Sequence, residues 1–302
     1  MAGSVPSSTP RLSPELVHAD WVAHPPGDTL RDYVLRPYAP VVDPTGRAHS
    51  VTLLRWFLRE AGLMGAWPLV ARCQEYLGPG ETVWGIKRGA GGELGIELYF
   101  YRDQGAVDPT KKTATALAAA LSDWLTIDTT LDESLDYMMC SLELTAEVLE
   151  QGRSEGFRVY TSGTRSVHGY DGLSYLATGR RLLRENVYHF YNAAEELDLV
   201  EAQLQNSVRG GGDLRLLPRG LTDCYTICFA VKREADTLYF SRVTTRQARA
   251  TLKSLWPPVS KLLSAHKHDF AHLRWDVGYD FTAPASALGA PVIQKVGLYG
   301  YC

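Results

Sequence analysis

The chain has 302 residues, with 31 Lys and Arg against 34 Asp and Glu, which gives a net charge of -3. Because binding to a phosphate backbone needs a surplus of basic residues, this balance argues against a nucleic-acid partner and makes any anion site local. No run approaches the ~20 apolar residues of a membrane span, and the opening residues lack the basic start and apolar stretch of a signal peptide. We therefore expect a cytoplasmic protein with no membrane partner, whose five cysteines are reduced thiols because no CxxC pair is present.

Residues 1–49 are rich in Pro, Ser and Asp and predict a partly ordered N-terminal leader, while residues 50–302 predict a single domain. Helical and strand periodicity then alternate along the chain. The expected elements are helices over 51–63 and 67–77, a strand pair at 82–87 and 94–101, a helix over 110–125, a second pair at 137–144 and 157–162, helix throughout 172–209, a third pair at 224–231 and 237–242, a helix over 245–263 and a last pair at 271–281 and 292–301. The strand at 137–144 also contains strong helix formers and could be helical.

Four of these strands alternate apolar residues with polar or tyrosyl ones, so that each has one apolar and one polar face. The polar sets are Glu97, Tyr99 and Tyr101; Arg158 and Tyr160; Tyr239; Lys295, Tyr299 and Tyr301. Helices long enough to cover the apolar faces separate the pairs, which indicates that the polar faces converge on an enclosed interior. The predicted fold is therefore α+β, an antiparallel β-barrel of repeated ααββ units with helices outside. A (β/α)₈ barrel is less consistent, because its strands are single, parallel and apolar.

Three stretches resemble the aromatic prenyltransferases of the αββα fold, or PT-barrel. Lys295-Val-Gly-Leu-Tyr299 is similar to the closing strand of small bacterial members, Val231-Lys-Arg-Glu-Ala-Asp-Thr-Leu-Tyr239-Phe-Ser to one of their hairpins, and Arg158-Val-Tyr160 to a Lys/Arg-x-Tyr strand pattern. The resemblance is spread from Thr82 to the C-terminus. It implies five strand pairs, of which four are predicted, so the fifth is sought between Gly163 and Leu221. The family also usually has a basic residue on the strand at 225–231, where Thr226 or Cys228 takes the inward position here.

The resemblance implies an allylic diphosphate as substrate, and the inward-facing residues fit its chemistry. Departure of the diphosphate needs cations aimed at its oxygens, tyrosine rings shield the allylic carbocation, and a carboxylate accepts the proton that the acceptor loses. The candidates are Lys87, Arg158, Arg274 and Lys295 for the diphosphate; Tyr160, Tyr239 and Tyr299 for the cation; and Glu97 or Glu143 for the proton. No cofactor is required and no metal site is predicted, although Mg²⁺ is possible. Asp276 and Asp280 share a face with Arg274 and could orient it or hold Mg²⁺.

Three functions remain open at this point. The first is a monomeric prenyltransferase of secondary metabolism, which adds a C5 or C10 unit to an aromatic or guanidino acceptor on a small metabolite or modified peptide. The second is a non-catalytic barrel that binds a hydrophobic or anionic small molecule. The third is an unrelated α+β enzyme with an ordinary open sheet, whose Lys and Tyr residues would lie on the surface.

Overall fold

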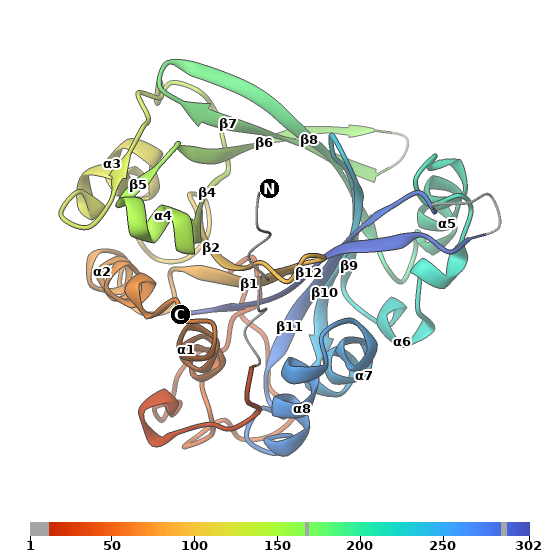
Figure 1. Cartoon of the computed structure of the whole chain (residues 1–302), viewed down its shortest axis with the longest axis horizontal. Helices are drawn as coiled ribbons and strands as arrows, with labels where there is room; N and C mark the ends of the chain where they lie inside the picture. The colour runs from red at the N-terminus through yellow and green to blue at the C-terminus, as the bar shows by residue number, and fades with distance from the viewer. Residues whose placement is uncertain (1–11, 167–168, 285–288) are drawn as a thin grey trace, which may run out of the picture.

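Ten antiparallel strands close into a barrel in the computed structural model, which describes residues 12–166, 169–284 and 289–302 (Figure 1). Around the barrel the strands follow the order β1-β12-β11-β10-β9-β8-β7-β6-β4-β2. Their bounds are β1 Val83–Gly89, β2 Leu94–Tyr101, β4 Met139–Thr145, β6 Phe157–Ser166, β7 Gly169–Thr178, β8 Arg181–Asn192, β9 Thr226–Val231, β10 Asp236–Thr244, β11 Arg274–Thr282 and β12 Val292–Tyr301. Two short strands, β3 (Thr126–Ile127) and β5 (Arg153–Ser154), pair in parallel outside the barrel.

Helices surround most of this barrel (Figure 1). They are α1 Ser50–Glu60, α2 Trp67–Leu77, α3 Ala114–Leu121, α4 Ala146–Gln151, α5 Leu197–Asn206, α6 Arg219–Thr222, α7 Thr245–Leu255 and α8 Pro257–Ala265, with 3₁₀ turns η1 His18–Asp20, η2 Met64–Ala66, η3 Pro109–Lys112 and η4 Leu214–Leu216. The strands β6, β7 and β8 follow one another with no helix between them, so the element order departs from a regular helix–helix–strand–strand repeat. Among the described helices, none is both long and apolar enough to cross a membrane.

The period-2 pattern assigns opposite faces of each strand to opposite environments. On β2, Leu98 packs in the large core between barrel and helices, whereas Tyr99 belongs to a separate aromatic cluster inside the barrel. On β12, Val296 likewise joins the outer core, and Lys295 lines an internal cavity. The prediction that the Lys and Tyr faces point into an enclosed interior is therefore confirmed, because side chains alternate between the two faces of a strand.

The prediction of helix throughout residues 172–209 is wrong. Strands β7 and β8 occupy most of this stretch and pair antiparallel across a turn at Gly179, and only α5 is helical. Residues such as Leu, Arg and Glu dominate here and have good helix propensity, but pairing with β6 and β9 overrides that weak preference. Both strands lie between Gly163 and Leu221, where a fifth strand pair was sought.

The N-terminal segment reaches into the barrel. Within it, Asp32 accepts hydrogen bonds from the backbone N–H groups of Val34 (3.0 Å) and Arg36 (2.8 Å), which forms a tight turn with Leu35 at a positive φ of 60°. The turn directs Tyr33 against the rings of the barrel tyrosines. Residues 12–49 of the predicted leader thus carry defined contacts, and residues 1–11 lie outside the described part of the chain.

Candidate functional site

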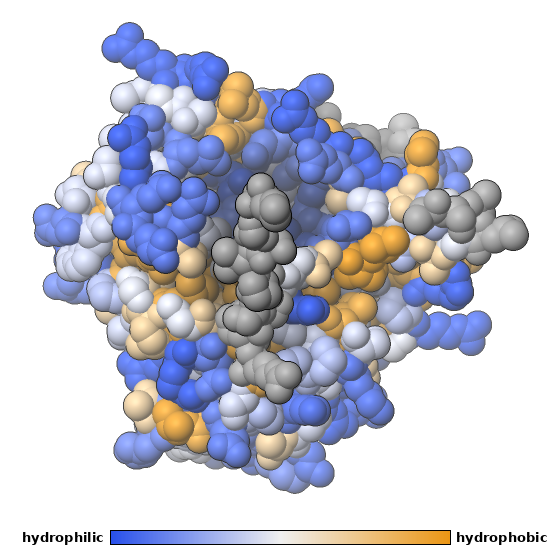
Figure 2. All heavy atoms as spheres, in the orientation of Figure 1, coloured by the Kyte–Doolittle hydropathy of each residue, from blue (hydrophilic) through white to orange (hydrophobic). Residues whose placement is uncertain are grey.

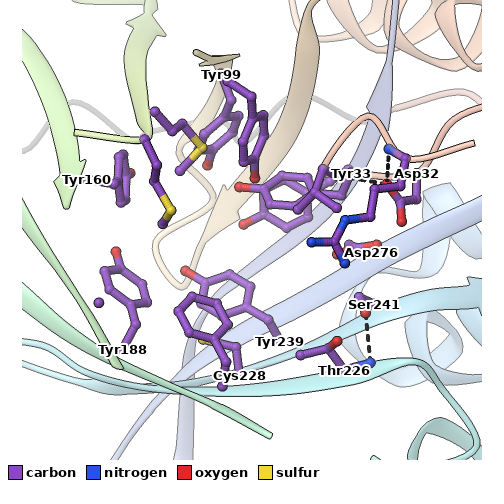
Figure 3. A pocket seen from close by; sticks show the side chains of 18 of the residues that line it. Asp32, Tyr33, Tyr99, Tyr160, Tyr188, Thr226, Cys228, Tyr239, Ser241 and Asp276 are labelled. Carbon is purple, nitrogen blue, oxygen red and sulfur yellow. Dashed lines mark hydrogen bonds between the residues drawn. The ribbon is translucent and has the colours of Figure 1, made fainter. Parts of the chain in front are cut away.

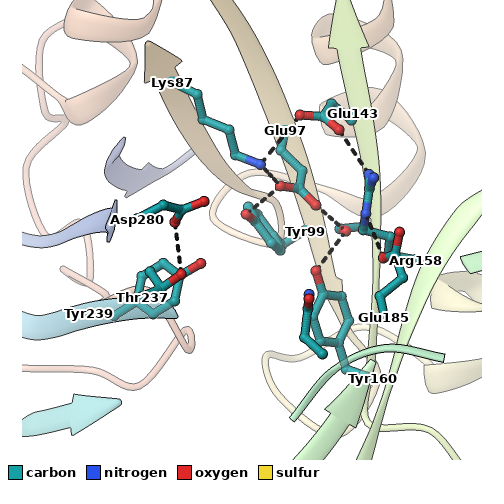
Figure 4. Close-up of polar contacts among 12 residues, drawn as sticks. Lys87, Glu97, Tyr99, Glu143, Arg158, Tyr160, Glu185, Thr237, Tyr239 and Asp280 are labelled. Carbon is teal, nitrogen blue, oxygen red and sulfur yellow. Dashed lines mark hydrogen bonds and ion pairs between the residues drawn. The ribbon is translucent and has the colours of Figure 1, made fainter. Parts of the chain in front are cut away.

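Two adjoining cavities lie inside the barrel. The larger, about 410 Å³, is lined mainly by tyrosines and is called here the aromatic chamber (Figure 3). The smaller, about 170 Å³, is lined mainly by ionised side chains and is called the charged chamber (Figure 4). Both are bordered by Tyr99, Tyr160, Tyr188 and Tyr239, which therefore form the boundary between them. On the outside, the face seen in Figure 2 has a central recess with hydrophilic walls.

Register along the strands explains why the two chambers differ. On β12, Lys295 lines the charged chamber and Tyr299 the aromatic one. On β11, Asp280 and Asp276 are separated in the same way. A strand rises about 3.3 Å per residue, so residues four apart on one face differ by about 13 Å along the barrel. The sequence therefore encodes a barrel that is ionic at one end and aromatic at the other.

The charged chamber brings together four cations and four carboxylates. They are Lys87, Arg158, Lys232 and Lys295 with Glu97, Glu143, Glu185 and Asp280. Arg158 is held between Glu143 and Glu185 at 2.9 Å each, Lys87 pairs with Glu97 and lies 3.7 Å from Glu143, and Lys232 lies 2.9 Å from Asp280. Within the described residues, Lys295 is the one of these cations without an ion pair. The positive and negative charges of the chamber thus balance in the absence of a ligand, and the Lys295 ammonium group remains available to pair with a bound anion.

Lys295 is held in an unfavourable position for a positive charge. Repulsion from Lys87 and burial lower its pKa below 10.5, although Asp280 partly offsets them. An anion bound beside Lys295 would remove this penalty, because it supplies the opposite charge that the site lacks. The electrostatics of the chamber therefore favour an anionic ligand beside Lys87 on β1, Lys232 just after β9 and Lys295 on β12.

Glu97 is the most strongly held carboxylate of the chamber. It accepts hydrogen bonds from the hydroxyls of Tyr99 (2.7 Å) and Ser141 and pairs with Lys87. Burial alone would raise the pKa of Glu97, but the charges of Lys87 and Arg158 overcome that effect and hold the pKa below its usual range. The group is therefore ionised and has its oxygens occupied. Glu143 is more open, with 30% of its side chain exposed, and so is the better placed of the two predicted proton acceptors.

The aromatic chamber is built by tyrosines that need glycines opposite them. Gly85 on β1 pairs with Tyr299, and a Cβ on Gly85 would lie 2.5 Å from two ring carbons of Tyr299. Gly278 on β11 pairs with Tyr239, and a Cβ there would also overlap the facing ring. The two glycines thus leave room for the rings to lie over the neighbouring strand. Burial raises the pKa of Tyr239 and Tyr299, so both are neutral phenols whose π faces are available.

The far end of the aromatic chamber is closed by the N-terminal turn. Tyr33 lies 5.3 Å from the ring centroids of both Tyr99 and Tyr299, and Figure 3 shows it entering beside Asp32. Asp32 accepts a 2.6 Å hydrogen bond from Arg242, whose own backbone N–H donates to Asp276. Burial and the nearby charge of Asp32 raise the pKa of Asp276. This end therefore presents an aromatic wall and the Asp276 carboxyl group, which forms no ion pair among the described residues although Arg36 lines the same chamber.

Most residues predicted from the sequence meet at these chambers. Lys87, Glu97, Glu143, Arg158, Tyr160, Tyr239 and Lys295 line the charged chamber, and Tyr160, Tyr239 and Tyr299 line the aromatic one. Arg274 lines neither. It begins β11, six residues and so about 20 Å from Asp280, and its N–H donates to Tyr38. It therefore lies too far from the lysines to share a phosphate with them.

Several residues that line the chambers were not singled out from the sequence. Lys232 continues the inward face of Thr226 and Cys228 just beyond β9, and it donates to Tyr239 at 3.2 Å. The period-2 pattern could have identified it, since it lies two residues past Ala230. Glu185 is on β8, which was predicted to be helical, and Tyr33 is in the leader. Neither carried a sequence signal of its role.

A magnesium ion fits the charged chamber only with the help of a substrate. Glu143 and Glu185 offer partly exposed oxygens of the kind Mg²⁺ prefers. No three Asp, Glu, His or Cys ligand atoms converge in this chamber within the part of the chain that the structure describes. Mg²⁺ often uses one or two carboxylates plus substrate phosphates, which this arrangement allows.

No family model and no curated protein matches the sequence.

Proposed function

We propose that the barrel transfers a C5 or C10 prenyl group from an allylic diphosphate to an acceptor held in the aromatic chamber. The observation that supports this most directly is the junction of the two chambers at Tyr99, Tyr160, Tyr188 and Tyr239. An allylic diphosphate has an anionic head and an apolar tail, and a chamber pair with the same polarity would bind it lengthwise. A cavity of about 410 Å³ is within the usual range for small-molecule sites.

In this proposal the lysines bind the leaving group. Lys87, Lys232 and Lys295 contact the diphosphate oxygens and stabilise the negative charge that develops as the allylic C–O bond breaks. When bound, Mg²⁺ would neutralise part of the same charge and would be held by Glu143 or Glu185 together with the diphosphate. Arg158 offsets part of the negative charge of those two carboxylates by donating to both. Lys87 and Lys232 also lie against carboxylates, so a bound diphosphate would compete with Glu97 and Asp280 for these lysines.

The tyrosines have the role of shielding the carbocation. The rings of Tyr99 and Tyr239 each lie 6.1 Å from the ring of Tyr299 by centroid, so a cation released at the boundary would face π electrons rather than water. The acceptor attacks the cation from the aromatic chamber and then loses a proton. Glu143 lines the charged chamber and is more exposed than Glu97, so it is the proposed final proton acceptor, directly or through water.

Asp276 bears on the class of acceptor. It is a buried carboxyl group that lines the aromatic chamber beside Arg36, and it accepts a hydrogen bond from the backbone N–H of Arg242, but it forms no ion pair among the described residues. A guanidino acceptor placed beside Asp276 would add a paired positive charge and favour the ionised form of Asp276. An aromatic acceptor would stack on the tyrosines and accept a hydrogen bond from the protonated form instead. Asp276 therefore favours a guanidino group, with an aromatic acceptor as the second choice.

The alternative is a barrel that binds an anion without catalysis. It is favoured by the internal pairing of Lys87, Arg158 and Lys232, which satisfies three of the four cations without any ligand. The open sheet required by an unrelated α+β enzyme is not observed, since the strands close.

Mass spectrometry decides between the remaining functions. The protein is incubated with dimethylallyl or geranyl diphosphate, with and without Mg²⁺, and with a panel of indoles, phenols and peptides that contain Arg, Tyr or Trp. A gain of one C5 or C10 unit supports the proposal. Binding of the diphosphate without any transferred product would support the non-catalytic barrel. The absence of binding would exclude prenyl transfer and leave a barrel that binds another hydrophobic or anionic small molecule.

A further inference from the structure

A second cluster of polar side chains lies outside the lumen, where the N-terminal segment packs against the start of β11. One ligand atom from each of His24, Asp28 and His49 lies within 4.8 Å of the other two. His24 Nδ1 is 2.7 Å from Asp28 Oδ2, and His49 Nε2 is 3.9 Å from the same oxygen. The ring of His272 lies edge-on to His24, with centroids 4.8 Å apart. Two imidazoles and a carboxylate therefore share one site, and the ring of His272 lies beside it.

The imidazoles are buried without the hydrogen bonds that they need. The side chain of His24 is fully buried and His272 is 1% exposed. Within the described residues, His24 Nε2 and both nitrogens of His272 have no hydrogen-bond partner. A neutral imidazole has one donor and one acceptor, and leaving either unpaired in the interior is costly. The cluster therefore keeps imidazole nitrogens buried without protein partners, as a site for a bound group would.

We propose that His24, Asp28 and His49 form a site for Zn²⁺ or a similar first-row divalent cation, with the adjacent His272 as fourth ligand after a movement of its side chain. Imidazole nitrogens and one carboxylate oxygen are typical ligands of Zn²⁺, which is bound at about 2.0–2.2 Å in four-coordinate sites. The 2.7 and 3.9 Å separations bracket the distance between neighbouring ligands of such a site, so a small movement of the side chains suffices.

The state of the imidazoles is compatible with this role. Burial and the neighbouring histidines lower the pKa of His49 to about 3 and that of His272 to about 4, so both are neutral at neutral pH. Neutral imidazole is the form that binds a metal. His49 Nδ1 accepts a 3.2 Å hydrogen bond from Val51 N–H, and coordination through Nε2 would place the ring proton on Nδ1 and give up that bond.

The position of the site indicates that the metal is structural. It would join the N-terminal segment to the first turn of α1 and to the residue that precedes β11 by two positions. Tyr38 already bridges these parts, since its hydroxyl donates to the His272 carbonyl at 3.4 Å and accepts from Arg274 N–H at 2.9 Å. The turn that carries Asp32 and Tyr33 lies between His24 and Tyr38 in sequence. A metal at the cluster would therefore fix the segment that closes the aromatic chamber.

The test uses the full chain, treated with a chelator and then titrated with ZnCl₂ in a calorimeter. We expect one equivalent to bind, a rise of roughly 5 °C in the unfolding temperature at saturation, and visible absorption bands of a four-coordinate centre when Co²⁺ replaces Zn²⁺. The isosteric Asp28→Asn and the variants His24→Ala and His49→Ala should each weaken Zn²⁺ binding by at least about 100-fold, and His272→Ala by at least about 10-fold.

The chain offers a matched control. His266 forms a similar His–Asp pair, with Nδ1 3.0 Å from Asp269, at the end of α8 and outside the cluster. His266→Ala should leave Zn²⁺ binding unchanged. Asp28 is partly exposed, so its Asn variant keeps the fold even if an alanine at a buried histidine does not. The proposal would be overturned if the wild type bound no Zn²⁺, or if Asp28→Asn and His49→Ala bound it as tightly as the wild type.

Discussion

Replacement of Lys295 by Ala tests the proposed diphosphate site most directly. Lys295 is half-buried in the charged chamber, and no carboxylate of the described residues pairs with it, so its charge is available to a ligand. A charge-assisted hydrogen bond contributes about 1.5–3 kcal/mol, which corresponds to roughly a 10- to 150-fold weaker Kd for dimethylallyl diphosphate. The free protein should not lose stability, because the substitution removes the repulsion between Lys295 and Lys87.

Isothermal titration with dimethylallyl diphosphate and with inorganic diphosphate measures this effect. The loss should be similar for both ligands, since Lys295 binds the shared head group rather than the prenyl chain. Lys253→Ala, on the exposed surface of α7, is the matched control and should leave both Kd values unchanged. An unchanged Kd in Lys295→Ala, with the unfolding temperature preserved, would refute the assignment of Lys295 to the diphosphate.

Three further predictions follow from the chambers. Lys295 loses its charge as pH rises, and because its pKa is lowered, diphosphate affinity should begin to fall at a lower pH than with an ordinary lysine. Lys295→Arg keeps its charge and should shift this loss of affinity to higher pH when the Kd is measured over a pH series. Gly85→Ala should displace the Tyr299 ring and reduce the free energy of unfolding by about 1–3 kcal/mol, whereas Gly220→Ala, with open space around its Cβ, should not; denaturant titration measures both. The pKa of Asp276 is raised in the folded protein, so the wild type loses stability as pH rises through that pKa. Asp276→Asn should therefore raise the free energy of unfolding at pH 7. The same variant should weaken binding of guanidino compounds but not of phenols.

The sequence predicted the barrel well because the relevant signal is local. Alternation along β2 and β12 assigns Tyr99 and Lys295 to one face irrespective of the strands that pair with them. The turns that join β1 to β2 and β9 to β10 are short, so each hairpin could be identified by itself. The closure of the barrel then followed from the need to enclose the polar faces and to remove the sheet edges.

The errors arose where local preference and tertiary environment disagree. Leu183 and Glu185 on β8 belong to a stretch of good helix formers, and its strand conformation depends on pairing with β7 and β9. Tyr33 is in a Pro-rich segment without periodicity, so its insertion among barrel tyrosines could not be predicted. His24 and His272 are nearly the whole chain apart, and only the folded structure shows that they meet. Long-range contacts of this kind leave no pattern in a single sequence.

The balance of charge in the charged chamber leads to a last prediction, on Mg²⁺. Four cations face four carboxylates there, so the chamber itself is close to neutral. A diphosphate with up to three negative charges would therefore leave the buried complex strongly anionic, which a low-dielectric interior disfavours. One Mg²⁺ bound between the diphosphate and Glu143 or Glu185 offsets most of that excess. We expect diphosphate to bind at least about 10-fold more tightly with Mg²⁺ than with a chelator, and Glu143→Gln to reduce this difference because it removes both a ligand and one negative charge. If Mg²⁺ made no difference to the Kd measured by titration, the charge argument would be wrong, and the three lysines alone would be sufficient to bind the diphosphate.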